Sequence, residues 1–191
     1  MIKLYIDSSD LQIITKYAKD DHISGFTTNP SLMRKAGVTN YAEFGKVATA
    51  AALGKPISFE VLDLNHTEVK RQAKLISAWG PNVYVKVPII DTNGDGMEDV
   101  IGDLSVSGIP INIKAVLTMT QLYTARRVLQ GCLTPGIISI FAGRIADTGR
   151  DPRSYVAISQ YLQYIPEVQI LWASTREVLN IGQAEESGAD I

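Results

Sequence analysis

Metal-binding residue types are scarce in this chain of 191 residues, which contains one cysteine, Cys132, and two histidines, His22 and His66. A single cysteine cannot form an intrachain disulfide, and these few residues leave no cluster with the spacing of a zinc site. No glycine-rich dinucleotide-binding fingerprint follows any predicted strand. We therefore expect neither a metal nor another cofactor.

The sequence also has no excess of positive charge and no long apolar run. The 18 Lys and Arg residues against 20 Asp and Glu give a net charge of −2, whereas nucleic acids and anionic membranes are bound by basic surfaces. No apolar run approaches the roughly 20 residues that cross a bilayer. Residues 1–7 lead directly into a strand pattern instead of a signal peptide. These features favour a cytoplasmic protein that binds neither nucleic acid nor membrane.

The most informative segment present is 83–88, Val-Tyr-Val-Lys-Val-Pro, which sets one lysine in a short apolar run. Its β-branched and aromatic residues predict a strand buried on both faces. Because burial penalises a charged amine, Lys86 is expected to have a depressed pKa and to act as a neutral nucleophile toward carbonyls. The alternative, from this run alone, is a lysine at the strand end whose amine reaches solvent.

Strand and helix patterns alternate along the whole chain. The expected strands are 3–6, 25–29, 56–62, 83–88, 111–116, 137–141, 168–172 and the start of an eighth at 188–191, and the expected helices include 11–17, 41–53, 66–79, 118–130, 155–164 and 175–186. Such alternation is typical of a parallel sheet, and eight units favour a closed (β/α)8 TIM barrel over an open doubly wound sheet. We expect a single domain, 1–191, that lacks the final helix and is truncated in or after the eighth strand. Either a terminal piece is lost or another subunit covers that face.

Polar residues recur at the carboxyl ends of these strands, where the chemistry of such a barrel takes place. Each has an ordinary structural explanation: Asp7 and Ser174 fit helix caps, and Asn29 fits a turn. Their recurrence at successive strand ends favours a functional site, because ionisable groups at the mouth of a packed barrel are costly unless they are paired or used. The set is Asp7, Thr28, Asn29, Glu60, Lys86, Asn112, Lys114, Ser139, Arg144, Ser174 and Arg176.

These residue types fit one reaction. A desolvated lysine forms a Schiff base with a ketone, and a carboxylate removes a hydroxyl proton. Two arginines hold a phosphate through paired hydrogen bonds. These are the requirements of a class I aldol cleavage.

Five segments that lie in order along the whole chain are distinctive: Leu-Tyr-Ile-Asp at 4–7, Gly-Phe-Thr-Thr-Asn-Pro-Ser-Leu at 25–32, Val-Lys-Val-Pro at 85–88, Phe-Ala-Gly-Arg-Ile at 141–145 and Ala-Ser-Thr-Arg at 173–176. Together they resemble the short transaldolases, the branch that also holds fructose 6-phosphate aldolase. The resemblance implies sugar phosphates as partners, a homo-oligomer such as a pentamer or decamer, and the pentose phosphate pathway by analogy.

The resemblance also implies roles for individual residues. Lys86 would be the Schiff-base lysine, Asp7 the acid/base that deprotonates the hydroxyl during carbon–carbon cleavage, and Glu60 the carboxylate that moves protons through a bound water. The implied substrate-binding residues are Thr28, Asn29, Asn112 and Ser139 around the three-carbon dihydroxyacetone unit, with Phe141 nearby, and Arg144, Ser174 and Arg176 at the phosphate.

Two positions lean toward transaldolase. The aldolases of the family carry glutamine at the place of Glu60 and tyrosine at the place of Phe141, whose hydroxyl helps to release free dihydroxyacetone. Glu60 and Phe141 instead imply an enamine that survives until an aldehyde acceptor arrives. The leading expectation is therefore transfer of a dihydroxyacetone unit from a ketose phosphate to an aldose phosphate, with aldolase cleavage or a degenerate sugar-phosphate-binding barrel as alternatives.

Lys114 departs from the family, which has a threonine at this place. Strand alternation puts Lys114 on the same face as Asn112. A second cation there depresses the pKa of Lys86, pairs with Glu60, or is itself the reacting amine. The remaining interpretation is a drifted position whose side chain points away.

Overall fold

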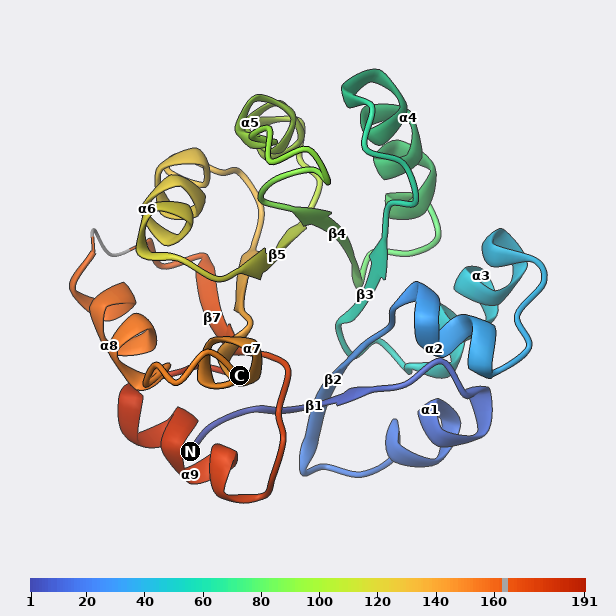
Figure 1. The fold of residues 1–191 in the computed structure, drawn as a ribbon. Coiled ribbons are helices and arrows are strands. Elements are labelled where there is room, and N and C mark those ends of the chain that lie inside the picture. Colours follow the sequence, from blue (N-terminus) through green and yellow to red (C-terminus); the bar gives the residue numbers. More distant parts are fainter. Residues whose placement is uncertain (163–164) are drawn as a thin grey trace. The chain divides into compact units, whose positions relative to one another are not determined.

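The computed structural model describes residues 1–162 and 165–191 and consists of two compact units. Lys3–Lys86 form one, called here the N-terminal unit, and Met1–Ile2 with Val87–Ile191 form the other, the C-terminal unit. Within each unit, parallel strands alternate with helices (Figure 1). The α/β class with parallel pairing, predicted from the alternation of patterns, is thereby confirmed.

The N-terminal unit carries four strands in sequential order. Its elements are β1 (Leu4–Asp7), α1 (Leu11–Tyr17), β2 (Ile23–Thr27), α2 (Pro30–Lys35), α3 (Tyr41–Ala51), β3 (Ile57–Glu60), α4 (His66–Ser77) and most of β4 (Val83–Pro88). The pairing is β1-β2-β3-β4, all parallel. Helix α4 buries Val69, Ala73 and Ile76, spaced four and three residues apart, so that one apolar stripe faces the core.

An aromatic cluster anchors the end of β3. The rings of Tyr41, Phe44 and Trp79 each contact Phe59 edge to face, with centroids 5.1 to 6.5 Å apart. The half-buried Tyr41 donates a hydrogen bond from its hydroxyl to the carbonyl oxygen of Glu60 at 2.7 Å. The aromatic core therefore positions the backbone of the residue that ends β3.

The C-terminal unit carries three further strands in sequential order. Its elements are α5 (Glu98–Val106), β5 (Ile111–Val116), α6 (Met119–Val128), β6 (Gly136–Ile140), α7 (Ala142–Ala146), α8 (Arg153–Tyr161), β7 (Val168–Trp172) and α9 (Leu179–Ser187). The pairing is β5-β6-β7, again parallel. Strand β6 is buried at all five positions, as expected of a strand covered on both faces.

Several predicted boundaries differ from those observed. The strand expected at 137–141 ends at Ile140, because the chain turns at Phe141 into the short helix α7, which the sequence patterns did not predict. The helix expected at 175–186 begins only at Leu179. The end expected for the helix 155–164 lies outside the described residues, and α8 runs over Arg153–Tyr161.

The predicted eighth strand is present only as strand-like pairing. Gly188, at a φ of 90°, ends α9 in a left-handed conformation. The amides of Asp190 and Ile191 then donate to the carbonyl of Ile170, and the amide of Trp172 donates to the carbonyl of Ile191. Residues 188–191 therefore extend along β7 without a regular strand assignment. None of the helices in the described ranges is long and apolar enough to cross a membrane.

Candidate active site

Lys86 lies in the middle of β4 and is 9% exposed. Its Nζ donates a hydrogen bond of 2.9 Å to the carbonyl oxygen of Thr28. This burial favours the interpretation of Lys86 as a desolvated amine over that of a lysine whose head reaches solvent.

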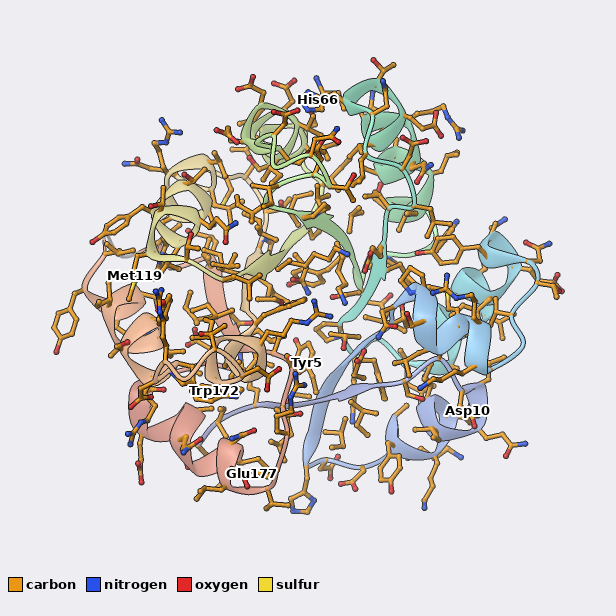
Figure 2. All side chains as sticks on the ribbon, in the orientation of Figure 1. Tyr5, Asp10, His66, Met119, Trp172 and Glu177 are labelled. Atoms are coloured by element: carbon orange, nitrogen blue, oxygen red, sulfur yellow. The ribbon has the colours of Figure 1, made fainter. Side chains whose placement is uncertain are left out.

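Asp7 is held at the end of β1 by two neighbours. The Thr27 hydroxyl donates to Oδ1 of Asp7 at 2.8 Å, and the Asn29 side-chain amide donates to Oδ2 at 3.2 Å. Asp7 does not cap α1, because Asp10 accepts the hydrogen bonds from the first amides of that helix (Figure 2). The helix-cap explanation for Asp7 is therefore wrong, and its carboxylate is available for another role.

Thr28 contacts Lys86 through its backbone. Its hydroxyl is buried and donates to the carbonyl of Ser58 at 2.9 Å, while its own carbonyl accepts from Lys86. Asn29 accepts from the amide of Leu32 as the N-cap of α2, and Pro30 occupies the first helical position. The Thr-Thr-Asn-Pro segment thus joins Asp7 on one side and Lys86 on the other to the start of α2.

The two carboxylates and the lysine face the same side of the sheet. Residues paired in a parallel sheet point to the same face, and so do residues two apart on a strand. Asp7 pairs with Thr27, Thr27 with Ser58 and Ser58 with Tyr84, while Glu60 pairs with Lys86 one step further along. We call Asp7, Thr27, Thr28, Asn29, Glu60 and Lys86 the amine cluster.

Thr27 is the member of this cluster that the sequence analysis missed. It lies directly before Thr28, and the strand-end criterion selected Thr28 and Asn29 instead. No local pattern identifies it, because Thr27 shares the face of Asp7 through the register between β1 and β2, which only the structure shows.

Tyr5 lies on the same face as the amine cluster, because it is two residues before Asp7 on β1 (Figure 2). Its ring fills the space over Gly25, where a Cβ atom would come within 2.4 Å of it. Burial, followed by the charge of Tyr84, raises the pKa of Tyr5 far above its ordinary value. The Tyr5 side chain is therefore uncharged at physiological pH and borders the amine cluster on this face of the sheet.

In the C-terminal unit, Asn112 and Ser139 come together on neighbouring strands. Both are buried, and the Ser139 hydroxyl donates to Oδ1 of Asn112 at 2.7 Å. The two side chains predicted to bind substrate hydroxyls are thus in direct contact with each other.

Lys114 lies in an irregular part of β5. Ile113 pairs with Ile138 and Val116 with Ile140, so Lys114 and Ala115 together oppose Ser139 alone. This is a bulge, and Ala115 adopts a left-handed φ of 60° within it. The bulge interrupts the regular alternation of side chains between the two faces of the strand. The sequence argument that placed Lys114 on the face of Asn112 therefore does not apply here. Lys114 is half-buried.

A second group of predicted residues surrounds the start of α7. The Arg144 guanidinium carbon lies 5.4 Å from the ring centroid of Phe141, a cation–π distance. Gly143 is in close contact with the chain after β7, because a Cβ atom at this position would lie 1.8 Å from the carbonyl oxygen of Ser174. Ser174 itself has a left-handed φ of 64°. We call Arg144, Asp147, Ser174 and Arg176 the arginine cluster.

Arg176 is held by a carboxylate that the sequence analysis did not select. Its Nη2 donates to Oδ2 of Asp147 at 2.6 Å, and its Nη1 donates to the hydroxyl and carbonyl oxygens of Ser174 at 3.0 and 3.2 Å. The hydrogen bond from Arg176, followed by the charges of Arg176 and Arg144, lowers the pKa of Asp147 below its ordinary value. No sequence signal identified Asp147, which follows α7 in a segment expected to be a loop.

Metal-ligating residues are not gathered into a site in the part of the chain that the structure describes, where no group of three or more His, Cys, Asp or Glu could hold an ion. His22 pairs with Asp20 at the surface, and His66 begins α4 at the periphery of its unit (Figure 2).

The two units therefore carry groups that suit different kinds of chemistry. The amine cluster offers a buried amine with two carboxylates on the same face, a set suited to carbonyl addition and proton transfer. The arginine cluster offers two guanidinium groups and a hydroxyl, a set suited to an oxyanion such as phosphate.

Comparison with known proteins agrees with this chemistry. Residues 4–191 match the family described as "Transaldolase/Fructose-6-phosphate aldolase". A "Probable transaldolase" from Dehalococcoides mccartyi is 32% identical over 193 residues, which cover 100% of this chain and 85% of the relative. Proteins of the same name from Bdellovibrio bacteriovorus and Alkaliphilus metalliredigens are 31% and 33% identical over 192 residues, with 84% and 85% of the relatives covered. The chain therefore belongs to the transaldolase/fructose-6-phosphate aldolase family.

Proposed function

We propose that this protein is a transaldolase that transfers a dihydroxyacetone unit from a ketose phosphate to an aldose phosphate through a Schiff base on Lys86. The observation that carries the proposal is the buried amine of Lys86 on the sheet face that also bears Asp7 and Glu60. Family membership and the names of the relatives support the same reaction.

In the proposed cycle, neutral Lys86 Nζ adds to the ketone carbon of the donor, and loss of water gives an iminium. Glu60 is proposed to supply and remove the protons of this dehydration through a water molecule. Asp7 accepts the proton of the C4 hydroxyl while the C3–C4 bond breaks, and the iminium takes up the bonding electrons to become an enamine. The enamine then attacks the acceptor aldehyde, Asp7 returns the proton, and hydrolysis frees Lys86.

The hydrogen bonds of Asp7 suit this role. The hydroxyl of Thr27 and the amide of Asn29 both donate to the carboxylate. They fix the direction in which the carboxylate points. Thr27 is thereby proposed as a positioning residue for the base.

The remaining predicted residues are proposed to bind substrate. Asn112 and Ser139, joined by their hydrogen bond, would hold hydroxyls of the three-carbon unit together with Asn29. Arg144, Ser174 and Arg176 would bind the phosphate, which needs cationic donors in paired geometry. Phe141 supports transfer over release of free dihydroxyacetone, because it has no hydroxyl to protonate the enamine.

We also propose that the chain forms one (β/α)8 barrel domain and assembles into a cytoplasmic homo-oligomer, a pentamer or decamer. The unbroken alternation of strands and helices supports the barrel, and family membership supports the assembly. Light scattering coupled to gel filtration measures the subunit number, and a monomer at micromolar concentration would contradict the assembly.

The test of the chemistry is borohydride reduction in the presence of fructose 6-phosphate, followed by peptide mass mapping. We expect a three-carbon adduct on Lys86. Lys86→Met should lose both the adduct and turnover, while the matched variant Lys114→Met should keep the adduct on Lys86. An adduct on Lys114 would place the nucleophile there instead.

Two further outcomes would replace the proposed reaction with an alternative. Binding of ketose phosphates without any adduct would indicate a sugar-phosphate-binding barrel. Turnover of fructose 6-phosphate at full rate without an acceptor would indicate an aldolase.

A further inference from the structure

The hydrogen-bonding edge of Arg176 is already occupied in the free protein. Nη2 and Nε both donate to Asp147, at 2.6 Å to Oδ2 and 3.4 Å to Oδ1, and Nη1 donates to both oxygens of Ser174. The edge formed by Nε and Nη2 can pair with a carboxylate or a phosphate through two parallel hydrogen bonds. A phosphate that binds Arg176 through this edge must therefore take the place of Asp147.

The ion pair between Arg176 and Asp147 can open so that Arg176 takes another partner. The side chains of Arg176 and Asp147 are 48% and 56% exposed, so water solvates either group when the pair opens. An exposed pair of this kind is weak, because solvent screens its charges. The charge of Arg144 also lowers the pKa of Asp147, so this carboxylate interacts with both arginines of the cluster.

We propose that Asp147 is an exchangeable counter-ion, a positioning residue that holds the guanidinium of Arg176 in the free enzyme and yields it to the phosphate of the substrate. This inference rests on the proposed function, because it takes the arginine cluster as the phosphate site. Asp147 lowers the affinity for phosphate by competing for Arg176, and it keeps the guanidinium beside Ser174 when no substrate is bound. Selectivity between phosphorylated and unphosphorylated sugars then depends on a residue that does not touch the bound phosphate.

The first test measures binding of inorganic phosphate by titration calorimetry at constant pH and ionic strength. Asp147→Asn keeps the size and an acceptor oxygen but removes the charge, and it should bind phosphate about threefold more tightly, the range expected for loss of one exposed ion pair. Asp147→Glu keeps the charge and should remain within about twofold of the native affinity.

Asp151 supplies the matched control. Oδ2 of Asp151 lies 2.7 Å from Nη2 of Arg153, with the two side chains 52% and 50% exposed, so this pair matches the Asp147 pair in distance and exposure but lies outside the arginine cluster. Asp151→Asn should leave phosphate affinity unchanged. If Asp147→Asn and Asp151→Asn tightened phosphate binding equally, the change in net charge alone would explain the effect, and the inference would be overturned.

The second test separates positioning from folding. In Asp147→Asn, the KM for fructose 6-phosphate should fall by about the same factor as the phosphate dissociation constant. The KM for unphosphorylated fructose should fall less than the KM for fructose 6-phosphate, because fructose has no phosphate that competes with Asp147 for Arg176. A rise in KM for fructose 6-phosphate would mean that Asp147 only orders Arg176, and the counter-ion inference would fail.

Failure of the proposed function gives a different result. If Arg176→Ala leaves phosphate affinity unchanged, the arginine cluster is not the phosphate site, and both proposals fall together. If Arg176→Ala weakens phosphate binding while Asp147→Asn does not tighten it, only the counter-ion inference is wrong.

Discussion

The amine cluster and the arginine cluster are held in place by different forces. In the amine cluster, strand register sets the positions: Lys86 is buried, and its Nζ donates to the backbone carbonyl of Thr28. In the arginine cluster, Arg176 and Asp147 are half-exposed and hold each other through side-chain charges. The difference suits the proposed roles, because the proposed nucleophile Lys86 is shielded from solvent, whereas the proposed phosphate-binding Arg176 can change partners.

The backbone carbonyl is a suitable partner for a nucleophilic amine. A carbonyl oxygen accepts a hydrogen bond from the neutral amine as well as from the ammonium form. It therefore fixes the position of Lys86 Nζ without requiring the charge.

The largest effect should come from Asp7→Asn, which removes the proposed base from the amine cluster. We expect kcat to fall by about 10²- to 10⁴-fold, the usual contribution of a general base. Borohydride trapping on Lys86 should persist, because Schiff-base formation precedes cleavage. Asp10→Asn is the control: Asn is as good an N-cap as Asp, so the cap of α1 and kcat should both be kept. Full activity of Asp7→Asn would show that Asp7 is not the base. The chemical role that distinguishes the amine cluster from the arginine cluster would then be lost.

Gly143→Ala should damage the arginine cluster through backbone packing. The added Cβ atom would lie 1.8 Å from the Ser174 carbonyl oxygen, so the backbone must shift. We expect the free energy of unfolding to fall by about 2 to 3 kcal/mol, as for overpacking, and the KM for phosphorylated sugars to rise. Gly182→Ala, with nothing within 4 Å of the added atom, should not destabilise the protein. Urea unfolding of the two variants measures the difference, and equal stabilities would contradict the role given to Gly143.

Ala115→Gly tests whether the bulge in β5 stores strain. Ala115 has a left-handed φ of 60°, which glycine adopts freely. We expect the free energy of unfolding to rise by about 0.5 kcal/mol, the relief of strain less the added entropy of the unfolded chain. Ala157→Gly in α8, a position of ordinary helical geometry, should instead lose about 1 kcal/mol. A loss at both positions would show that the bulge is unstrained.

The smallest effect should be that of Asp147→Asn on stability. The pKa of Asp147 is lowered in the folded protein, so its pairing stabilises the fold above the ordinary carboxyl pKa and ceases to do so as the pH falls through the lowered value. We expect the variant to melt at most about 2 °C below the native protein at pH 7, because the pair is exposed. The difference should vanish in strong acid. A large decrease at neutral pH would mean that Asp147 is a structural residue.

Much of the candidate site could be predicted from the sequence because its residues end strands. Lys86 and Glu60 were predicted from the polarity of single positions within or after apolar runs, and the structure pairs them on adjacent strands. Phe141 was predicted to end a strand, but the chain turns one residue earlier, and its ring instead contacts Arg144. Strand patterns do not specify such a turn, because both sides of it are apolar.

By itself, the sequence determined the order of strands and helices, the burial of the lysine strand and the residue types of the site, because these follow from local patterns of apolar and polar residues. Only the tertiary structure decided which side chains meet. Thr27 reaches Asp7 from 20 residues away, Ser139 reaches Asn112 from 27 and Asp147 reaches Arg176 from 29. Each of these contacts depends on strand register and on backbone angles such as those of Ala115 and Ser174, which are set by packing between segments and leave no local pattern in the chain.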